Sequence, residues 1–216
     1  MANRAIFWFR RDLRLADNPA LLASLDEGKE VIPLFIMDDE IAERAGDHRR
    51  AYLAASLRAL NDSLGGALHL ISGDPVAVLS ELKKKTGASS IHCAFPFAPY
   101  GNAQDEKLKK AGIELTQVGS GYAVAPGRVL KDDGTPYRVY TPFYRAWSAH
   151  SWRKPVAAPK NPNWVAPSKL AKIPDWKVPA GVTIQEAGEA AALKRFKEFL
   201  KRAADEYGDA RNIPGI

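Results

Sequence analysis

Five short apolar runs, separated by segments of helical period, account for most of the chain before residue 120. The runs have the length and the β-branched and aromatic content of buried strands, and they cover residues 5–9, 31–37, 67–72, 90–95 and 113–118. Between them lie three segments that place apolar side chains on one helical face, at residues 47–64, 75–82 and 102–111. This alternation predicts an α/β fold with right-handed crossovers. We expect a five-stranded, Rossmann-like parallel sheet in the order 3-2-1-4-5, flanked by helices.

The first apolar run is followed directly by charged residues. Ile6–Phe9 is typical of a strand buried on both faces, and the charged segment Arg10–Arg14 follows it directly. Asp17 or Asn18 is placed to cap a helix whose first turn contains Pro19. In a parallel α/β sheet this junction lies at the carboxyl edge, where ligands bind. A solvated loop with internal Arg–Asp ion pairs is the competing interpretation.

The predicted strand order places a pocket between the first and fourth strands. Its walls would be Arg10–Leu15, Phe95–Gly101 and, at the side, Met37–Glu40. The loop Phe95–Gly101 is aromatic and stiffened by proline, which suits either stacking of a planar ligand or capping of the sheet edge. The first strand is not followed by Gly-x-Gly-x-x-Gly, and the chain has no Walker lysine motif, which argues against an ordinary NAD site or P-loop.

The chain changes character after residue 120. Asp133-Gly134 between β-prone arms predicts a hairpin over residues 127–140. Thr141-Pro142 predicts the cap and first turn of a helix. Arg138 and Arg145 lie among aromatic residues, as on a nucleic-acid surface, although packing with the charged ends in water is the commoner role of such arginines.

Residues 151–184 contain six prolines and three tryptophans, a composition typical of an extended linker. Because exposed indole rings cost solubility, we expect this segment to lie along a surface. Residues 185–207 have the period of a strongly amphipathic helix whose apolar face has nothing after it to pack against, and that face carries Ala192, Phe196, Phe199, Leu200 and Ala203.

Composition limits the classes of function. Hydrophobic residues make up 46% of the chain and charged residues 26%, as in globular proteins, and neither a membrane span nor a signal peptide is recognisable. The single cysteine, Cys93, excludes an intramolecular disulfide and suits a reducing cytoplasm. The net charge of +6 permits a polyanionic partner without demonstrating one.

The four histidines show no metal-ligand spacing with cysteine or carboxylates, so we expect no metal site; they are His48, His69, His92 and His150. We expect His92, which lies in an apolar strand, to be buried and hydrogen-bonded.

Three segments, in order and at matching spacing, resemble the DNA photolyase/cryptochrome family over essentially residues 5–214. They are the N-terminal signature Trp8–Arg14 with Asp17-Asn18 and Ala20-Leu21, the hairpin-to-helix signature Tyr137–Phe143, and Gly188–Leu200 with Tyr207 and Arg211-Asn212 at the start of a helical domain. The resemblance implies a deoxyribodipyrimidine photolyase with two domains. In that family an α/β domain holds an antenna pigment, and a helical domain holds FAD and damaged DNA.

The resemblance also implies the reaction and some of its residues. Photoexcited reduced FAD donates an electron to a pyrimidine dimer flipped out of the duplex, and the dimer splits and returns the electron. By match to the family motif, Tyr207 would line the FAD site and Arg211 would contact a DNA phosphate. The antenna pocket would be formed by Arg10, Arg11, Asp12, Met37, Asp38 and Tyr100.

On this resemblance, residues 1–150 would be the antenna-binding domain, 151–184 an interdomain linker and 185–216 the first helix of a FAD-binding domain whose remainder is missing. The chain alone would then be inactive. Its partners would be DNA with ultraviolet lesions and its own helical domain, and an uncovered linker surface would also permit oligomers. No partner membrane is expected.

The pigment remains open between two alternatives. Folate and deazaflavin pigments in the family use amide and acidic side chains in the loop after the fourth strand, where this chain carries Ala94, Pro96, Ala98, Tyr100 and Gly101. Either a different pigment, such as a flavin stacked on aromatic rings, occupies the site, or the site is empty.

Two further functions compete with repair. A cryptochrome-type blue-light photoreceptor would share the fold and replace repair by signalling. A free-standing α/β module for a small ligand would fold residues 151–216 back onto the domain and cover them. The two light-driven functions instead predict that Trp152, Trp164 and the helix at 185–207 expose apolar area.

Overall fold

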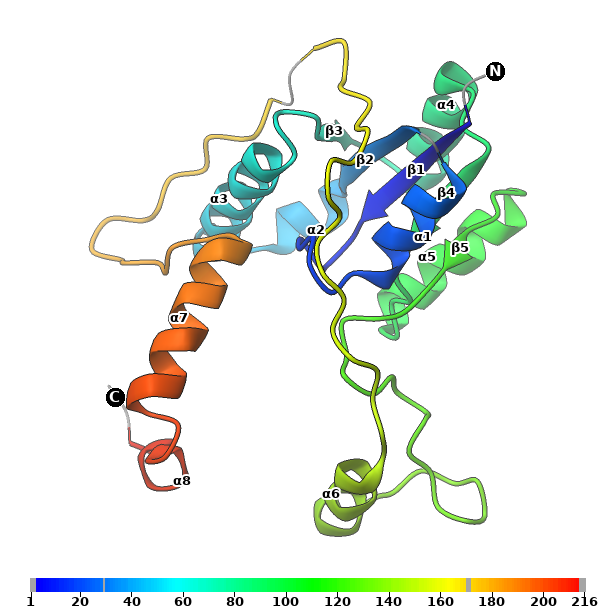
Figure 1. Cartoon of the computed structure of the whole chain (residues 1–216). Coiled ribbons are helices and arrows are strands. Elements are labelled where there is room, and N and C mark those ends of the chain that lie inside the picture. The colour runs from blue at the N-terminus through cyan, green and yellow to red at the C-terminus, as the bar shows by residue number, and fades with distance from the viewer. Residues whose placement is uncertain (1–2, 29, 170–171, 214–216) are drawn as a thin grey trace.

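A computed structural model of the 216-residue chain describes residues 3–28, 30–169 and 172–213. Five parallel strands form one sheet in the order β3-β2-β1-β4-β5, which confirms the predicted fold class (Figure 1). The strands are β1 (Arg4–Phe9), β2 (Glu30–Met37), β3 (His69–Ser72), β4 (Ser90–Cys93) and β5 (Thr116–Gln117). The helices are α1 (Pro19–Glu27), α2 (Asp39–Arg44), α3 (Asp47–Ser63), α4 (Pro75–Thr86), α5 (Pro99–Lys110), α6 (Tyr140–Ala149), α7 (Glu189–Arg202) and α8 (Tyr207–Ala210).

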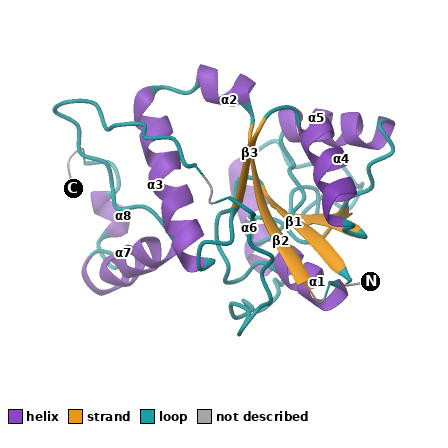
Figure 2. Ribbon diagram, turned by 90° about the horizontal axis from the view of Figure 1, so that it is seen from above, coloured by secondary structure: helices purple, strands orange, loops and turns teal. Residues whose placement is uncertain are grey.

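The central strand β1 is buried on both faces, as its continuous apolar run predicts. Phe7 and Phe9 belong to a core that includes side chains of α1 and α3. Ile6 and Trp8 belong to a second core on the opposite face, with side chains of α4 and α5. Figure 2 shows α1 and α3 apart from α4 and α5, with the strands between the two pairs. The sheet therefore has a helical layer on each face.

Side chains cap two helices where the sequence predicts it. The Asn18 side-chain oxygen accepts a hydrogen bond from the Leu21 amide at 3.2 Å and begins α1. Asp74 accepts from the Ala77 amide at 3.0 Å and begins α4. Of the two candidates for the first cap, Asn18 has this role and Asp17 does not.

The hairpin predicted over residues 127–140 is wrong. This segment contains no strand, and its turn is closed locally, by a bond from the Lys131 amide to the Thr135 carbonyl at 2.9 Å. Asp133 accepts hydrogen bonds from both the amide and the hydroxyl of Thr135. These local bonds form without a ladder, and Pro136 removes a donor that a ladder would need.

Several element ends also differ from the prediction. Thr141 lies inside α6, which Val139 precedes without a side-chain cap. Helix α5 begins at Pro99, three residues before its predicted start, because Pro99 suits a first helical turn. Strand β5 is limited to two residues at the sheet edge, and α7 is shorter at both ends than the predicted residues 185–207.

The proline-rich segment lies against the α/β body, and we call residues 153–188 the strap. Its residues 170–171 lie outside the described ranges. The Val31 amide donates to the Asn163 carbonyl at 3.0 Å, and the Val165 amide donates to the Val31 carbonyl at 2.8 Å. Trp164 and Trp176 pack against the core of α1 and α3, whereas Trp152 is 53% exposed. The strap is extended and follows a surface, as expected, but the expected exposure of Trp164 is wrong.

Two helices leave apolar faces uncovered. Neither α6 nor α7 contains a buried residue. On α7, Phe196 is 56% exposed and Leu200 is 53% exposed. Both helices project from the same side of the α/β body (Figure 1). Of the predicted final segment 185–216, residues 214–216 lie outside the described ranges.

His92 is a buried titratable residue of β4, and only 1% of its surface is exposed. Its Nε2 lies 3.0 Å from a Glu27 carboxylate oxygen and 3.0 Å from the Ser90 hydroxyl, as expected of a hydrogen-bonded core histidine. Burial lowers the pKa of His92, although the Glu27 carboxylate acts in the opposite direction. The folded chain therefore favours the neutral ring.

We expect the free energy of unfolding to fall as the pH is lowered through about 6.5, the pKa of an unfolded histidine. Above that pH His92 is neutral in both states, and below it the unfolded chain takes up a proton that the folded chain does not. Urea unfolding at about pH 7.5 and about pH 5.5 measures the decrease. In His92→Gln the decrease should be smaller, and in the exposed His48→Gln it should be unchanged. Equal decreases in all three chains would contradict the prediction.

Candidate functional site

The carboxyl ends of β1 and β2 open into a cavity of about 560 Å³, which we call the large cavity. Its volume lies within the range of small-molecule sites, roughly 300–1,000 Å³. Its walls come from both strand ends, from α2, α3 and α5, from the loop after β4 and from the strap. The apolar part of the wall includes Leu13, Phe35, Met37, Leu53 and Trp176. A cavity of suitable size therefore lies at the predicted carboxyl edge, but over the ends of β1 and β2, whereas the prediction places the pocket between the first and fourth strands.

Cations lie along the α3 side of the large cavity. Arg50 donates to the Ala42 and Glu43 carbonyls, each at 2.9 Å, and so ties α3 to α2. Arg11 and Arg49 also line the cavity, and within the described part of the chain neither forms an ion pair. An anionic group on a ligand would find two guanidinium groups available there.

A phenol and a carboxylate meet at another part of the cavity wall. The Tyr100 hydroxyl at the start of α5 donates to Asp38, which follows β2 and also caps α2 by accepting from the Glu40 amide at 3.1 Å. Gln104 donates to the same carboxylate at 3.3 Å. Burial, together with the bond to Asp38, raises the pKa of Tyr100, so the phenol stays protonated as a donor.

Arg10 lines both the large cavity and a second one. Its guanidinium pairs with Asp105 of α5 and lies 4.1 Å from the centre of the Trp8 ring. Gln117 of β5 donates to Asp105 at 2.7 Å. Nearby, burial raises the pKa of Cys93 to about 11, which keeps this sulfur a thiol.

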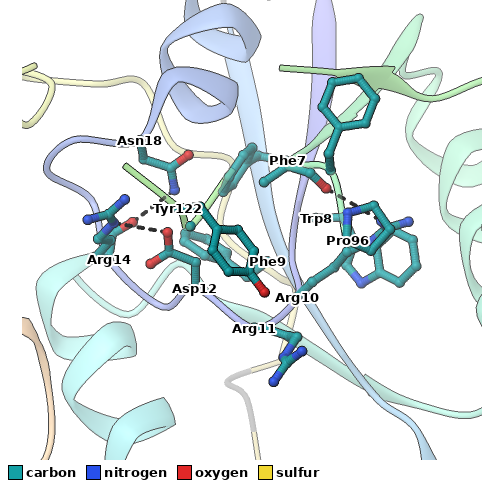
Figure 3. Close-up of a pocket in the computed structure, with 13 residues that line it drawn as sticks. Phe7, Trp8, Phe9, Arg10, Arg11, Asp12, Arg14, Asn18, Pro96 and Tyr122 are labelled. Atoms are coloured by element: carbon teal, nitrogen blue, oxygen red, sulfur yellow. Dashed lines mark hydrogen bonds and ion pairs between the residues drawn. The ribbon is translucent and has the colours of Figure 1, made fainter. Parts of the chain in front are cut away.

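The second cavity, which we call the small cavity, has a volume of about 330 Å³ (Figure 3). Arg14 bonds to Asp12 at 2.9 Å, and its carbonyl accepts from the Asn18 side chain at 3.0 Å. Burial raises the pKa of Asp12, and the Arg14 guanidinium opposes this rise. Figure 3 shows Arg11 projecting away from the Asp12–Arg14 pair. The predicted internal Arg–Asp pairing of this loop is therefore present beside the cavities.

The structure brings together most of the residues predicted to form the antenna pocket. Asp12 lines only the small cavity. The other five line the large cavity, and they are Arg10, Arg11, Met37, Asp38 and Tyr100.

The two residues expected to contact FAD and DNA lie elsewhere. Tyr207 begins α8, beyond the far end of α7, and its ring packs edge-to-face on Phe199 at 5.9 Å (Figure 1). The Arg211 amide donates to the Tyr207 carbonyl at 3.1 Å. Neither residue lines the two cavities.

Sequence reasoning missed several residues of the large cavity. Arg49, Arg50 and Leu53 belong to α3, whose periodicity predicts a helix but not which of its residues face a ligand. Asp105, the partner of Arg10, was also missed. For Trp176, the sequence offered one signal: a tryptophan in a proline-rich segment is expected to pack against a surface.

Within the described ranges, no group of three or more His, Cys, Asp or Glu side chains is arranged to hold a metal ion. None of the helices in that part of the chain has the length and apolar character needed to cross a membrane.

Comparison with known proteins gives one consistent family. A family model described as DNA photolyase matches residues 5–162. The deoxyribodipyrimidine photo-lyase of a Synechococcus strain is 34% identical over 235 residues, which cover 99% of this chain and 49% of that enzyme. The chain thus spans about half the length of this curated relative.

Solved structures agree. A bacterial class III photolyase from Agrobacterium tumefaciens is 32% identical with a TM-score of 0.78, over 93% of this chain and 45% of that one. An archaeal photolyase from Sulfolobus tokodaii, described as holding two FAD molecules and as implying a novel light-harvesting cofactor, is 25% identical with a TM-score of 0.73, over 88% and 45%. The sheet, the cavities at its carboxyl edge and these matches together show that the chain belongs to the DNA photolyase family.

Proposed function

We propose that this chain is the antenna-binding α/β portion of a light-driven DNA photolyase, and that the large cavity holds the pigment. The observation that carries the proposal is the cavity itself, which combines apolar and aromatic walls with two arginines that form no ion pair with any other described residue. A planar pigment with an anionic group matches both features. Residues 1–150 would form the pigment-binding domain, and 151–184 its connection to a helical domain beginning at about residue 185.

A flavin-type pigment fits this lining better than a folate or a deazaflavin. The loop after β4 and the start of α5 present Pro96, Ala98, Tyr100 and Gly101 to the cavity. On the family resemblance, folate and deazaflavin pigments use amide and acidic side chains at these positions, and this chain carries none there. Met37 and Trp176 offer surfaces against which an aromatic ring system packs. The Sulfolobus tokodaii photolyase, with its two FAD molecules, supports this choice.

In the whole enzyme, the pigment would pass its excitation to reduced FAD in a helical domain, and the flavin would split pyrimidine dimers in DNA by electron transfer. The exposed apolar faces of α6 and α7 suit packing against such a domain. Tyr207 would join the FAD site and Arg211 the DNA contact, as their motif matches imply. The buried, protonated Cys93 is compatible with a cytoplasmic protein.

One observation favours a second function, a free-standing α/β module for a small ligand. The strap folds back onto the body and half-buries Trp164 and Trp176, as such a module requires. The uncovered apolar face of α7 favours the photolyase. Light-dependent repair of ultraviolet-damaged DNA by the full-length protein distinguishes the two. Light-induced flavin reduction without repair would indicate a cryptochrome-type photoreceptor.

Titration of the purified chain with FMN, a deazaflavin and a folate pigment tests the proposal. Pigment fluorescence reports the binding. We expect FMN to bind with a dissociation constant of about 10 µM or below, and the deazaflavin and the folate to bind at least about tenfold more weakly. Arg11→Gln and Arg49→Gln should each weaken FMN binding by about fivefold, since each removes a charge from the ligand site.

The matched control is Lys110→Gln, which removes a charge from the exposed end of α5, outside the cavity. This variant should bind FMN as the parent chain does. If none of the three pigments binds below about 1 mM, the cavity is not an antenna site and the proposal fails.

A further inference from the structure

Trp176 enters the large cavity from a segment outside the sheet and its crossovers. It lies in the strap, 59 residues after Gln117 at the end of β5. It nevertheless lines the cavity beside residues of β1 and β2. The ring also packs against the core formed with α1 and α3, so it is half-buried. A large aromatic side chain in this position contributes both shape and contact area to whatever the cavity holds.

Arg58 of α3 fixes the strap immediately before Trp176. Its guanidinium donates to the Pro174 carbonyl at 3.0 Å and lies 3.6 Å from the Asp175 carboxylate. The same Asp175 pairs with Lys177 at 2.6 Å. The backbone just before the indole is therefore held to α3 by the Arg58 guanidinium, whereas the Asp175–Lys177 pair is local to the strap.

Glu189 fixes the strap at its far end. The carboxylate accepts from the Leu15 amide at 2.8 Å and from the Ala16 amide at 3.0 Å, so that both oxygens are used. Gly188 has a φ of +103°, and a Cβ on it would lie 2.6 Å from the Ala59 Cβ of α3. Close approach at Gly188 thus lets Glu189 reach the β1–α1 loop, whose residues line both cavities.

We propose that Trp176 is a specificity-determining residue of the pigment site, and that Arg58 and Glu189 are the positioning residues that hold it against the cavity. The strap is then a wall of the binding site as well as a connection between domains. This inference rests on the proposed function, because it names the residue that selects the pigment. By thermodynamic linkage, a pigment packed on Trp176 also strengthens the attachment of the strap.

Pigment binding tests the first part. In Trp176→Ala, FMN should bind about tenfold more weakly, since stacking on an aromatic ring is worth on the order of 1–3 kcal/mol. Trp176→Phe should retain most of the affinity. FMN that co-elutes with the chain should be strongly quenched by the adjacent indole in the parent chain and markedly brighter in Trp176→Phe. Only FMN shown to be bound is compared, because FMN released by an unfolded variant is itself bright.

Trp164→Ala is the matched control, because Trp164 is the other strap tryptophan packed on the core and lies outside the cavity. Folded Trp164→Ala should bind FMN with the affinity of the parent chain and quench its fluorescence to the same extent. Equal losses in Trp164→Ala and Trp176→Ala, or unchanged quenching in Trp176→Phe, would overturn the assignment of Trp176.

Hydrogen exchange and limited trypsin digestion of the pigment-free chain test the second part. Glu189→Gln replaces one accepting oxygen by an amide nitrogen, so the Leu15 and Ala16 amides should exchange about tenfold faster, and trypsin should cut faster after Lys172 and Lys177, on either side of Trp176. Arg58→Gln should speed this cleavage alone. Glu198→Gln, the same change on the exposed face of α7, should alter neither result.

The two proposals fail separately. Unchanged cleavage after Lys172 and Lys177 in both Arg58→Gln and Glu189→Gln would show that these residues do not position the strap, whatever the chain binds. If the parent chain binds no pigment, the proposed function and the role of Trp176 in selection both fail, while the cleavage result still decides the positioning roles.

Discussion

Replacement of Arg10 by methionine should lower the free energy of unfolding by about 3–5 kcal/mol, the cost of removing one member of a buried ion pair. The side chains of Arg10 and Asp105 are only 12% and 20% exposed, so the variant leaves a carboxylate with Gln117 as its remaining partner. Urea unfolding followed by circular dichroism measures the loss. FMN binding should weaken in parallel, because Arg10 lines the large cavity.

A double variant separates the ion pair from simple loss of packing. Arg10→Met with Asp105→Leu removes both charges, and it should recover most of the stability lost in Arg10→Met. The control is Arg44→Met, which breaks the exposed i,i+4 pair with Glu40 and should cost less than about 1 kcal/mol. If the double variant is as unstable as the sum of the two single variants, the pair is not the source of the effect.

Replacement of Ala42 by tryptophan should abolish FMN binding, with a loss of at least about a hundredfold. Ala42 lies on the wall of the large cavity, on α2 at its open side, where a new indole occupies the volume required by the ligand. Removing the indole from the cavity to admit ligand would cost about 3 kcal/mol, similar to the cost of overpacking a core. Titration by pigment fluorescence measures the loss.

The control for this variant is Ala103→Trp, on the exposed face of α5 outside the cavity, which should bind FMN normally. Thermal unfolding should show that Ala42→Trp stays folded with a modestly lower Tm, because Ala42 borders the cavity but also packs against the core of α1 and α3. Undiminished FMN binding in Ala42→Trp would place the pigment elsewhere.

The regular part of the fold was predictable because its signals are local. The continuous apolar run of β1 and the strand–helix alternation sufficed to predict the sheet order and a site at its carboxyl edge. The caps at Asn18 and Asp74 were also predictable, since a cap needs only residues three positions apart. At Asp133-Gly134 the turn-forming dipeptide competed with Pro136, which cannot donate to a strand ladder, and the turn formed without the hairpin.

The candidate site was predictable in position and only partly in composition. Arg10, Met37 and Tyr100 were placed on it by their position after strands, and the structure brings them to one cavity. Asp12 was grouped with them, but its side chain pairs with Arg14 beside the small cavity. Which side of a loop a side chain faces depends on the partner it finds, and neighbouring residues in sequence can find partners on opposite sides.

The sequence by itself determined the α/β class, the strand order and the edge at which ligands bind, because hydrophobic period and chain connectivity specify these features over short distances. Only the tertiary structure decided that Arg10 pairs with Asp105, 95 residues away, on a wall that two cavities share. It alone placed Trp176 in the wall and Glu189 on the β1–α1 loop, 174 residues from Leu15. Such contacts join segments that carry no common local pattern, so they arise only when the chain packs.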